Sequence, residues 1–189
     1  MELLAPAGSR KALTAAVQSG ADAVYLGGPQ FGARYSAENF TIEEMKTWVD
    51  YCHLYGVDVH VTVNTLVKEK EIESLKEYLK QLNKIGVDAL IVQDMGAVEI
   101  IKKTVPDMTL HASTQMTVTS LEGVKYLEDM GFSRVVLARE LSEKEIEHIC
   151  KNAKAEIEVF VHGAICMCYS GQCLMSSILG GRSGNRGRC

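Results

Sequence analysis

The feature that most constrains the fold is an alternation, repeated along the chain, of short β-branched apolar runs and amphipathic helical stretches. Runs with the length and composition of buried strands occur at seven places: Glu2–Ala5, Ala23–Leu26, Asp58–Asn64, Ala89–Gln93, Thr109–Ala112, Arg134–Ala138 and Glu156–Val161. Helical stretches lie between them, near Arg10–Ser19, Ile42–Tyr55, Lys68–Ile85, Gly96–Thr104, Ser120–Met130 and Ser142–Asn152. Strands that alternate with helices predict a parallel sheet joined by right-handed crossovers.

The ends of the helical stretches carry their own signals. Residues that typically end helices follow five of them: Gly20, Gly56, Gly86, Pro106 and Gly131. Thr41 and Ser142 each precede a Glu-rich first turn, which predicts that both are N-caps. These signals support the same division of the chain as the periodicity.

Seven strands that alternate with helices are more than a flavodoxin-like sheet holds. They favour an α/β fold, an incomplete (β/α)8 TIM-like barrel of parallel strands. A complete barrel needs about 250 residues, whereas this chain has 189. The alternative is an open doubly wound sheet, but the G-x-G-x-x-G fingerprint of dinucleotide binding is absent after the first strand. We expect residues 1–164 to form the barrel and residues 165–189 to form a loop rich in Cys, Gly and Arg.

In a barrel of this kind, functional side chains gather at the carboxyl ends of the strands. The polar residues at those ends that we predict to be catalytic, and to converge on one face, are Asn64, Gln93, Ser113, Arg139 and His162. A guanidinium at this face would bind a carboxylate through two hydrogen bonds. Helix capping is the alternative role for Ser113. An ion pair with Glu140, or with an acidic residue of a helix, is the alternative for Arg139.

Neither an apolar stretch of about 18 residues nor a signal peptide is present, so the chain is not expected to span a membrane. Its six cysteines then indicate the cytoplasm, where thiols serve as metal ligands, catalysts or core residues. Cys52 and Cys150 fall on the buried spacing of helices and are predicted to be small core residues. His60, inside a strand run, is predicted to line the core.

Residues 160–189 combine four cysteines with many glycines and contain no Asp or Glu. Arg182, Arg186 and Arg188 make this segment basic although the whole chain has a net charge of −4, which predicts contact with an anion such as RNA phosphate. Solvated arginines are the alternative. The thiols favour a soft metal or an iron–sulfur cluster, which glycines would let the chain wrap closely. Buried free thiols are the rival interpretation.

The segment that follows the last strand resembles the signature of the peptidase U32 family, the collagenase-like proteases. The resemblance is carried by Glu158, Phe160, His162-Gly163-Ala164, Cys166, Gly171, Cys173 and Ser176. The opening Glu-Leu-Leu-Ala-Pro-Ala-Gly and the later Ala-Asp-Ala-Val-Tyr-Leu-Gly-Gly also resemble that family. The ending Gly-Gly-Arg-Ser-Gly-Asn-Arg-Gly-Arg-Cys is most similar to the branch that hydroxylates a cytidine of large-subunit ribosomal RNA. Sister branches hydroxylate tRNA uridine or assist oxygen-independent ubiquinone hydroxylation.

The resemblance implies a barrel that carries a 4Fe–4S cluster on four cysteines, with prephenate as a source of the hydroxyl oxygen. Cys166, Cys173 and Cys189 stand at ligand positions, and the fourth ligand is expected further downstream, so the chain is expected to be an N-terminal portion of such a protein. It also implies RNA (rRNA or tRNA) and a small carboxylate co-substrate as partners.

We therefore expect an RNA-modifying hydroxylase. A collagenase-like peptidase that uses Cys166 or Cys168 with His162 is the alternative; no H-E-x-x-H spacing occurs among the five histidines. A scaffold with a purely structural cluster is the third possibility.

Overall fold

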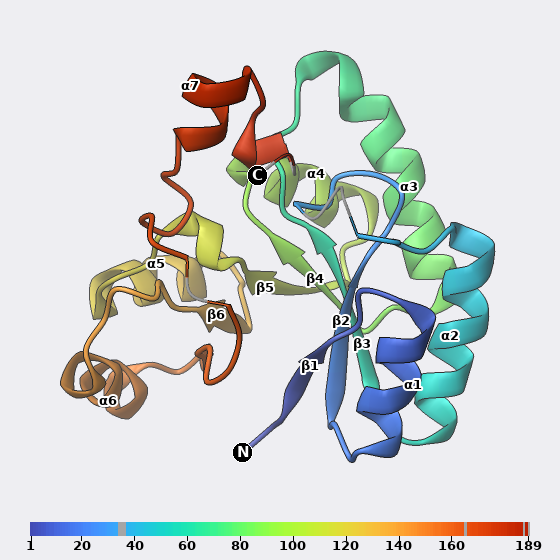
Figure 1. Cartoon of the computed structure of the whole chain (residues 1–189), viewed down its shortest axis with the longest axis horizontal. Coiled ribbons are helices and arrows are strands. Elements are labelled where there is room, and N and C mark those ends of the chain that lie inside the picture. Colours follow the sequence, from blue (N-terminus) through green and yellow to red (C-terminus); the bar gives the residue numbers. More distant parts are fainter. Residues whose placement is uncertain (34–36, 165, 187, 189) are drawn as a thin grey trace.

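Within residues 1–33, 37–164, 166–186 and 188, which the computed structural model describes, seven parallel strands form one curled sheet, a partial TIM-like barrel (Figure 1). The strands are β1 (Leu4–Pro6), β2 (Ala23–Gly27), β3 (Asp58–Val63), β4 (Ala89–Val92), β5 (Thr109–Ala112), β6 (Arg134–Val136) and β7 (Glu156–Glu158). Each strand pairs with the next one along the chain. Since the strand order never reverses, the sheet is not doubly wound, and the predicted barrel class is confirmed.

The helices alternate with the strands as the periodicity predicts. They are α1 (Arg10–Gln18), α2 (Ile42–Leu54), α3 (Ile72–Ile85), α4 (Met95–Thr104), α5 (Leu121–Asp129), α6 (Glu143–Asn152) and the short α7 (Met175–Gly180). Single 3-10 turns occur at Glu69–Glu71, Thr114–Met116 and Gly184–Arg186. The region predicted as a loop over 165–189 thus contains α7, which corrects that prediction. None of the helices in the described residues is long and apolar enough to cross a membrane.

The caps explain where two of the helices begin. Thr41 and Ser142 accept hydrogen bonds from the backbone amides of Glu44 and Glu145, and both glutamates bond back to the cap residue. These reciprocal pairs satisfy amide groups that a helix start leaves without partners, so both predicted N-caps are confirmed.

The core consists of apolar side chains of the strands packed between the helices and the inside of the curl. Val59, Val61 and Val63 of β3 and Leu90 of β4 are fully buried. Successive residues of a barrel strand face opposite sides of the sheet, so the three valines, two positions apart, lie on the same face of β3. His60 is also buried, as predicted, with its ring edge-on to that of His111 at 4.6 Å between centroids.

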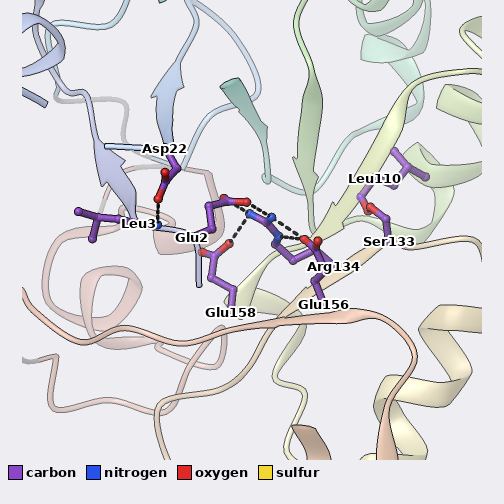
Figure 2. Close-up of polar contacts among 8 residues, drawn as sticks. All are labelled: Glu2, Leu3, Asp22, Leu110, Ser133, Arg134, Glu156 and Glu158. Atoms are coloured by element: carbon purple, nitrogen blue, oxygen red, sulfur yellow. Dashed lines mark hydrogen bonds and ion pairs between the residues drawn. The ribbon is translucent and has the colours of Figure 1, made fainter. Parts of the chain in front are cut away.

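The two edge strands, β1 and β7, do not pair with each other, and an ion-pair cluster connects their ends (Figure 2). Arg134, at the start of β6, donates two hydrogen bonds of 2.6 Å to Glu2 and two more, of 2.8 and 2.5 Å, to Glu156. Its guanidinium also lies 3.7 Å from Glu158. We call Arg134 with these three glutamates the closing cluster, since it joins the segment before β1 to β6 and β7 at the amino ends of the strands.

Candidate functional site

The polar residues at the carboxyl ends of the strands occupy the end of the sheet opposite the closing cluster. Asn64 follows β3 and Ser113 follows β5, and the Asn64 Nδ2 donates to the Ser113 Oγ at 3.4 Å. Gln93 follows β4, the strand between them, and its buried Oε1 has no hydrogen-bond partner among the described residues. Three of the five predicted catalytic residues therefore lie on adjoining strand ends, with one acceptor still available.

Two of these residues also hold loops. The Asn64 Oδ1 accepts a hydrogen bond of 2.9 Å from the Ala33 amide, in the loop after β2. The Ser113 Oγ accepts one of 3.2 Å from the Gln115 amide and caps the 3-10 turn that follows β5. The capping role that the sequence left open for Ser113 is thus present in the structure.

Arg139 does not pair with Glu140, contrary to the alternative that the sequence left open. Its Nε donates to the Ser170 Oγ at 3.1 Å and its Nη2 to the Cys168 carbonyl at 3.1 Å. Glu140 instead accepts a 2.9 Å hydrogen bond from the Ser170 amide. Arg139 and Glu140 together hold residues 166–173, which we call the cysteine loop, against the end of β6.

The cysteine loop is held on a second side by the connection between β5 and α5. The Thr117 Oγ1 donates to the Ser170 carbonyl at 2.7 Å. Gly171 has a φ of 70°, and a Cβ at this position would lie 2.1 Å from the Gln115 carbonyl oxygen. Only glycine allows so close a backbone approach, so the path of the loop is tightly determined around the buried Ser170.

The thiols of this loop have the chemistry of thiolate ligands. Cys166 and Cys173 are free, and the backbone hydrogen bond at Cys168 and the Arg139 guanidinium lower the pKa of the Cys166 thiol. Cys189, the third predicted ligand, lies outside the described residues. Within the residues that are described, no three His, Cys, Asp or Glu side chains gather as a metal site would require. The donor type therefore fits thiolate ligation at two of the three predicted positions.

The structure does not bring His162 into this arrangement. The residue is exposed, and no hydrogen bond in the described part of the chain involves its ring. Cys52 is fully buried, as predicted, and desolvation raises the pKa of its thiol to about 11. Cys150 is exposed, which contradicts the prediction of a core position. Helix α6 buries a single residue, Ile149. Its buried face is therefore narrow, and Cys150, the next residue along the helix, faces solvent.

The basic tail, which we define as residues 181–186 and 188, folds back over the loops that follow β2 and β3. Arg186 forms two hydrogen bonds with the Glu71 carboxylate, of 2.9 and 2.5 Å, and another with the Leu66 carbonyl. The Arg186 guanidinium lowers the pKa of Glu71 to about 2. Of the three arginines predicted to bind RNA, Arg186 is thus engaged with a carboxylate of the chain itself, whereas Arg182 and Arg188 are exposed.

A cavity of about 500 Å³ lies between the basic tail and these two loops. We call it the tail pocket, and its lining includes Phe31, Thr65, Lys68, Glu71 and Arg182. Sequence reasoning missed both Phe31 and Lys68. The signal that could have found Phe31 is its place in a Gly- and Pro-rich stretch directly after a strand, where barrels carry their binding loops.

A partial barrel with polar strand ends, a clamped cysteine loop and a basic tail at the same end defines a TIM-like protein whose candidate site lies at the carboxyl ends of the strands. The sequence profile of the family described as Peptidase family U32 matches residues 8–189. The chain belongs to that family.

Several relatives match the whole chain, among them one protein of Escherichia coli and one of Bacillus subtilis. The 23S rRNA 5-hydroxycytidine C2501 synthase of Escherichia coli is 46% identical over 189 residues, 100% of this chain and 28% of that protein. The tRNA hydroxylation protein P1 of Bacillus subtilis is 41% identical over 188 residues, 100% of this chain and 44% of that protein. The chain therefore spans less than half the length of either relative.

A solved structure supports the fold. The U32 peptidase Mk0906 superimposes with a TM-score of 0.70 at 20% sequence identity, covering 84% of this chain and 68% of that one. At this level of identity the likeness concerns the fold alone.

Proposed function

We propose that this chain is part of an RNA-modifying enzyme that hydroxylates a base of ribosomal or transfer RNA. The observation that carries the proposal is the identity of 46% and 41%, over the whole chain, with two proteins whose names state these activities. The arrangement of the chain agrees with the proposal, because hydroxylation of RNA needs a redox group close to a site for a polyanion. The cysteine loop would hold the redox group and the basic tail would bind the RNA, and both lie at the same end of the barrel. The proposal puts the protein in the cytoplasm.

In this proposal Cys166, Cys173 and Cys189 bind an iron–sulfur cluster, with a fourth ligand from outside the chain. When bound, the cluster would supply one-electron redox chemistry. Arg139, Glu140 and Ser170 would fix the loop that bears two of the ligands. The lowered pKa of Cys166 supports its ligand role, because thiolates and not thiols bind iron.

The strand ends would receive the reactants. The buried Oε1 of Gln93 would accept a hydrogen bond from the base, and Asn64 and Ser113 would keep the neighbouring loops in position. A small carboxylate such as prephenate is proposed as the oxygen donor. Arg182 and Arg188 would bind RNA phosphates.

The peptidase alternative has less support. A thiol nucleophile needs a base within hydrogen-bond reach, and the exposed His162 takes part in none of the hydrogen bonds of the described residues.

The test is a mass-spectrometric comparison of rRNA and tRNA nucleosides from the source strain and from a strain lacking the gene. We expect one hydroxylated pyrimidine to disappear on deletion and to return with the wild-type gene, but not with Cys166→Ser or Cys173→Ser. Cys52→Ser, a buried thiol remote from the loop, is the control that should restore it. An unchanged nucleoside profile in the deletion strain would contradict the proposal.

A further inference from the structure

We infer that the tail pocket binds one nucleotide of a single-stranded RNA, with the base against Phe31 and the phosphate at Lys68 and Arg182. The inference deepens the proposed function, since it rests on RNA as the substrate and assigns a subsite to it. The cavity of about 500 Å³ falls in the size range of small-ligand sites.

The wall of the pocket formed by the loop after β2 is held in place by hydrogen bonds to the region after β3. The Thr65 Oγ1 donates to the Phe31 carbonyl at 3.1 Å, and the Ala33 amide donates to Asn64 at 2.9 Å. The Ser74 Oγ donates to Gln30 at 2.9 Å. Three anchors on both sides of Phe31 mean that this wall exists before a ligand arrives, which lowers the entropy lost on binding.

Phe31 is an aromatic side chain held in an unusual backbone conformation. Its φ is 59°, in the left-handed region that a bulky residue seldom adopts. The ring is half-buried, packs against Tyr78 at 5.8 Å between centroids, and also lines the pocket. Strained residues of this kind concentrate at ligand sites, and a fixed aromatic surface is what single-stranded nucleic acids use for base stacking.

The charge of the lining suits a phosphate. Among the described residues that line the cavity, Lys68, Arg182, Arg186 and Arg188 are cationic and Glu71 is the single carboxylate. Since Glu71 is paired with Arg186 through two hydrogen bonds, these two residues form a neutral wall. Lys68 and Arg182 then leave an excess of positive charge beside an aromatic ring, the combination found in grooves for single-stranded nucleic acid. A cyclic dicarboxylate could use the same cations, but it has no planar aromatic face to stack on Phe31.

The inference is tested with the full chain and a fluorescently labelled ten-nucleotide single-stranded RNA, by anisotropy at several salt concentrations. Phe31→Leu should weaken binding by about tenfold, the effect of losing one stacked base, whereas Phe31→Trp should retain it. Lys68→Ala and Arg182→Ala should each reduce the slope of log K against log salt by about 0.7.

The matched controls are Tyr126→Leu, an exposed aromatic on α5, and Lys144→Ala, an exposed cation on α6. Both should bind like the wild type, and circular dichroism of every variant establishes that it is folded. The inference is overturned if Phe31→Leu binds the RNA as tightly as the wild type does. It is also overturned if prephenate binds in a way that requires Phe31 but does not displace the RNA.

The two proposals fail separately. If binding requires Phe31 but the deletion strain keeps all its hydroxylated nucleosides, the pocket stands and the hydroxylase function falls. If the nucleosides disappear on deletion but Phe31→Leu restores them fully, the function stands and the pocket assignment is wrong.

Discussion

Ser170 is the residue on which the cysteine loop depends most directly. Its side chain accepts from Arg139, its amide donates to Glu140 and its carbonyl accepts from Thr117. The connection between β6 and α6 and the one between β5 and α5 therefore both hold this one buried serine. Arg139 also affects the chemistry of the loop, because its positive charge favours the thiolate of Cys166. Arg139 thus both holds the loop that carries Cys166 in place and lowers the pKa of the Cys166 thiol.

We predict that Arg139→Ala raises the pKa of Cys166, since the substitution removes a hydrogen bond and a positive charge that stabilise the thiolate. The measurement is the pH profile of iodoacetamide alkylation at Cys166, followed by peptide mass spectrometry. Arg139→Lys keeps the charge and should give an intermediate profile, while Arg10→Ala, remote from the loop, should give the wild-type one. Identical profiles for Arg139→Ala and the wild type would show that Arg139 does not act on this thiol.

At the scale of elements, the closing cluster takes over part of the role that strand pairing plays elsewhere in the sheet. Neighbouring strands are joined by backbone hydrogen bonds, but β1 and β7 are edges, and the Arg134 side chain links their ends instead. The Arg134 side chain is only 8% exposed, so its charge depends on the three carboxylates. Removing a buried partner costs far more than removing an exposed one.

Arg134→Ala should lower the free energy of unfolding by about 3 kcal/mol, near the lower end of the range for a broken buried ion pair because Glu156 remains solvated. Urea denaturation followed by circular dichroism measures this loss. Arg10→Ala is the matched control, since the Arg10–Glu44 pair is exposed to solvent and contributes little to stability. Equal losses for the two variants would exclude a special role for the closing cluster.

Glu158 makes stability depend on pH. Desolvation raises the pKa of this carboxyl from 4.5 to about 7, against the attraction of Arg134. The folded chain therefore holds the proton more tightly than the unfolded chain, and the contribution to stability, complete below about pH 4.5, is lost as the pH rises through about 7.

Relative to Glu158→Gln, which does not titrate, the wild type should lose roughly 1 to 3 kcal/mol of stability between pH 5 and pH 8. The measurement is urea unfolding of both proteins across this range. His111, whose pKa burial lowers to about 3, titrates in both proteins and cancels in the difference. A difference that does not change with pH would mean that Glu158 is already ionised in the folded state.

For the molecule as a whole, the two ends of the barrel have different tasks. The closing cluster ties the amino ends of the strands, and the polar strand ends, cysteine loop and basic tail share the other end, as Figure 1 shows for the N-terminus and the tail. This separation is the usual one in barrels, where one face stabilises and the other binds. The tail belongs to the binding end because Arg186 connects it to Glu71.

Glu71→Gln should loosen the tail without affecting the barrel, because it removes the charge that holds Arg186. We expect trypsin to cleave after Arg182 or Arg186 several times faster in this variant, with a free energy of unfolding within about 1 kcal/mol of the wild type. Glu73→Gln, two residues further along the chain in the first turn of α3 and paired with Lys76, is the control. Wild-type cleavage rates in Glu71→Gln would show that other contacts hold the tail.

The sequence by itself determined the strands and helices, their parallel order, the caps at Thr41 and Ser142, and the placement of Asn64, Gln93 and Ser113 at strand ends. All of these depend on periodicity or on residues within one turn of each other. The tertiary structure alone decided the Arg134–Glu2 contact across 132 positions, the Arg186–Glu71 contact across 115, the burial of Ser170 and the place of Phe31 in a pocket. Such contacts depend on how far the sheet curls and where the tail returns, which no local pattern encodes. The sequence pattern also predicted a core position for Cys150. In the structure α6 buries only Ile149, and Cys150 is exposed.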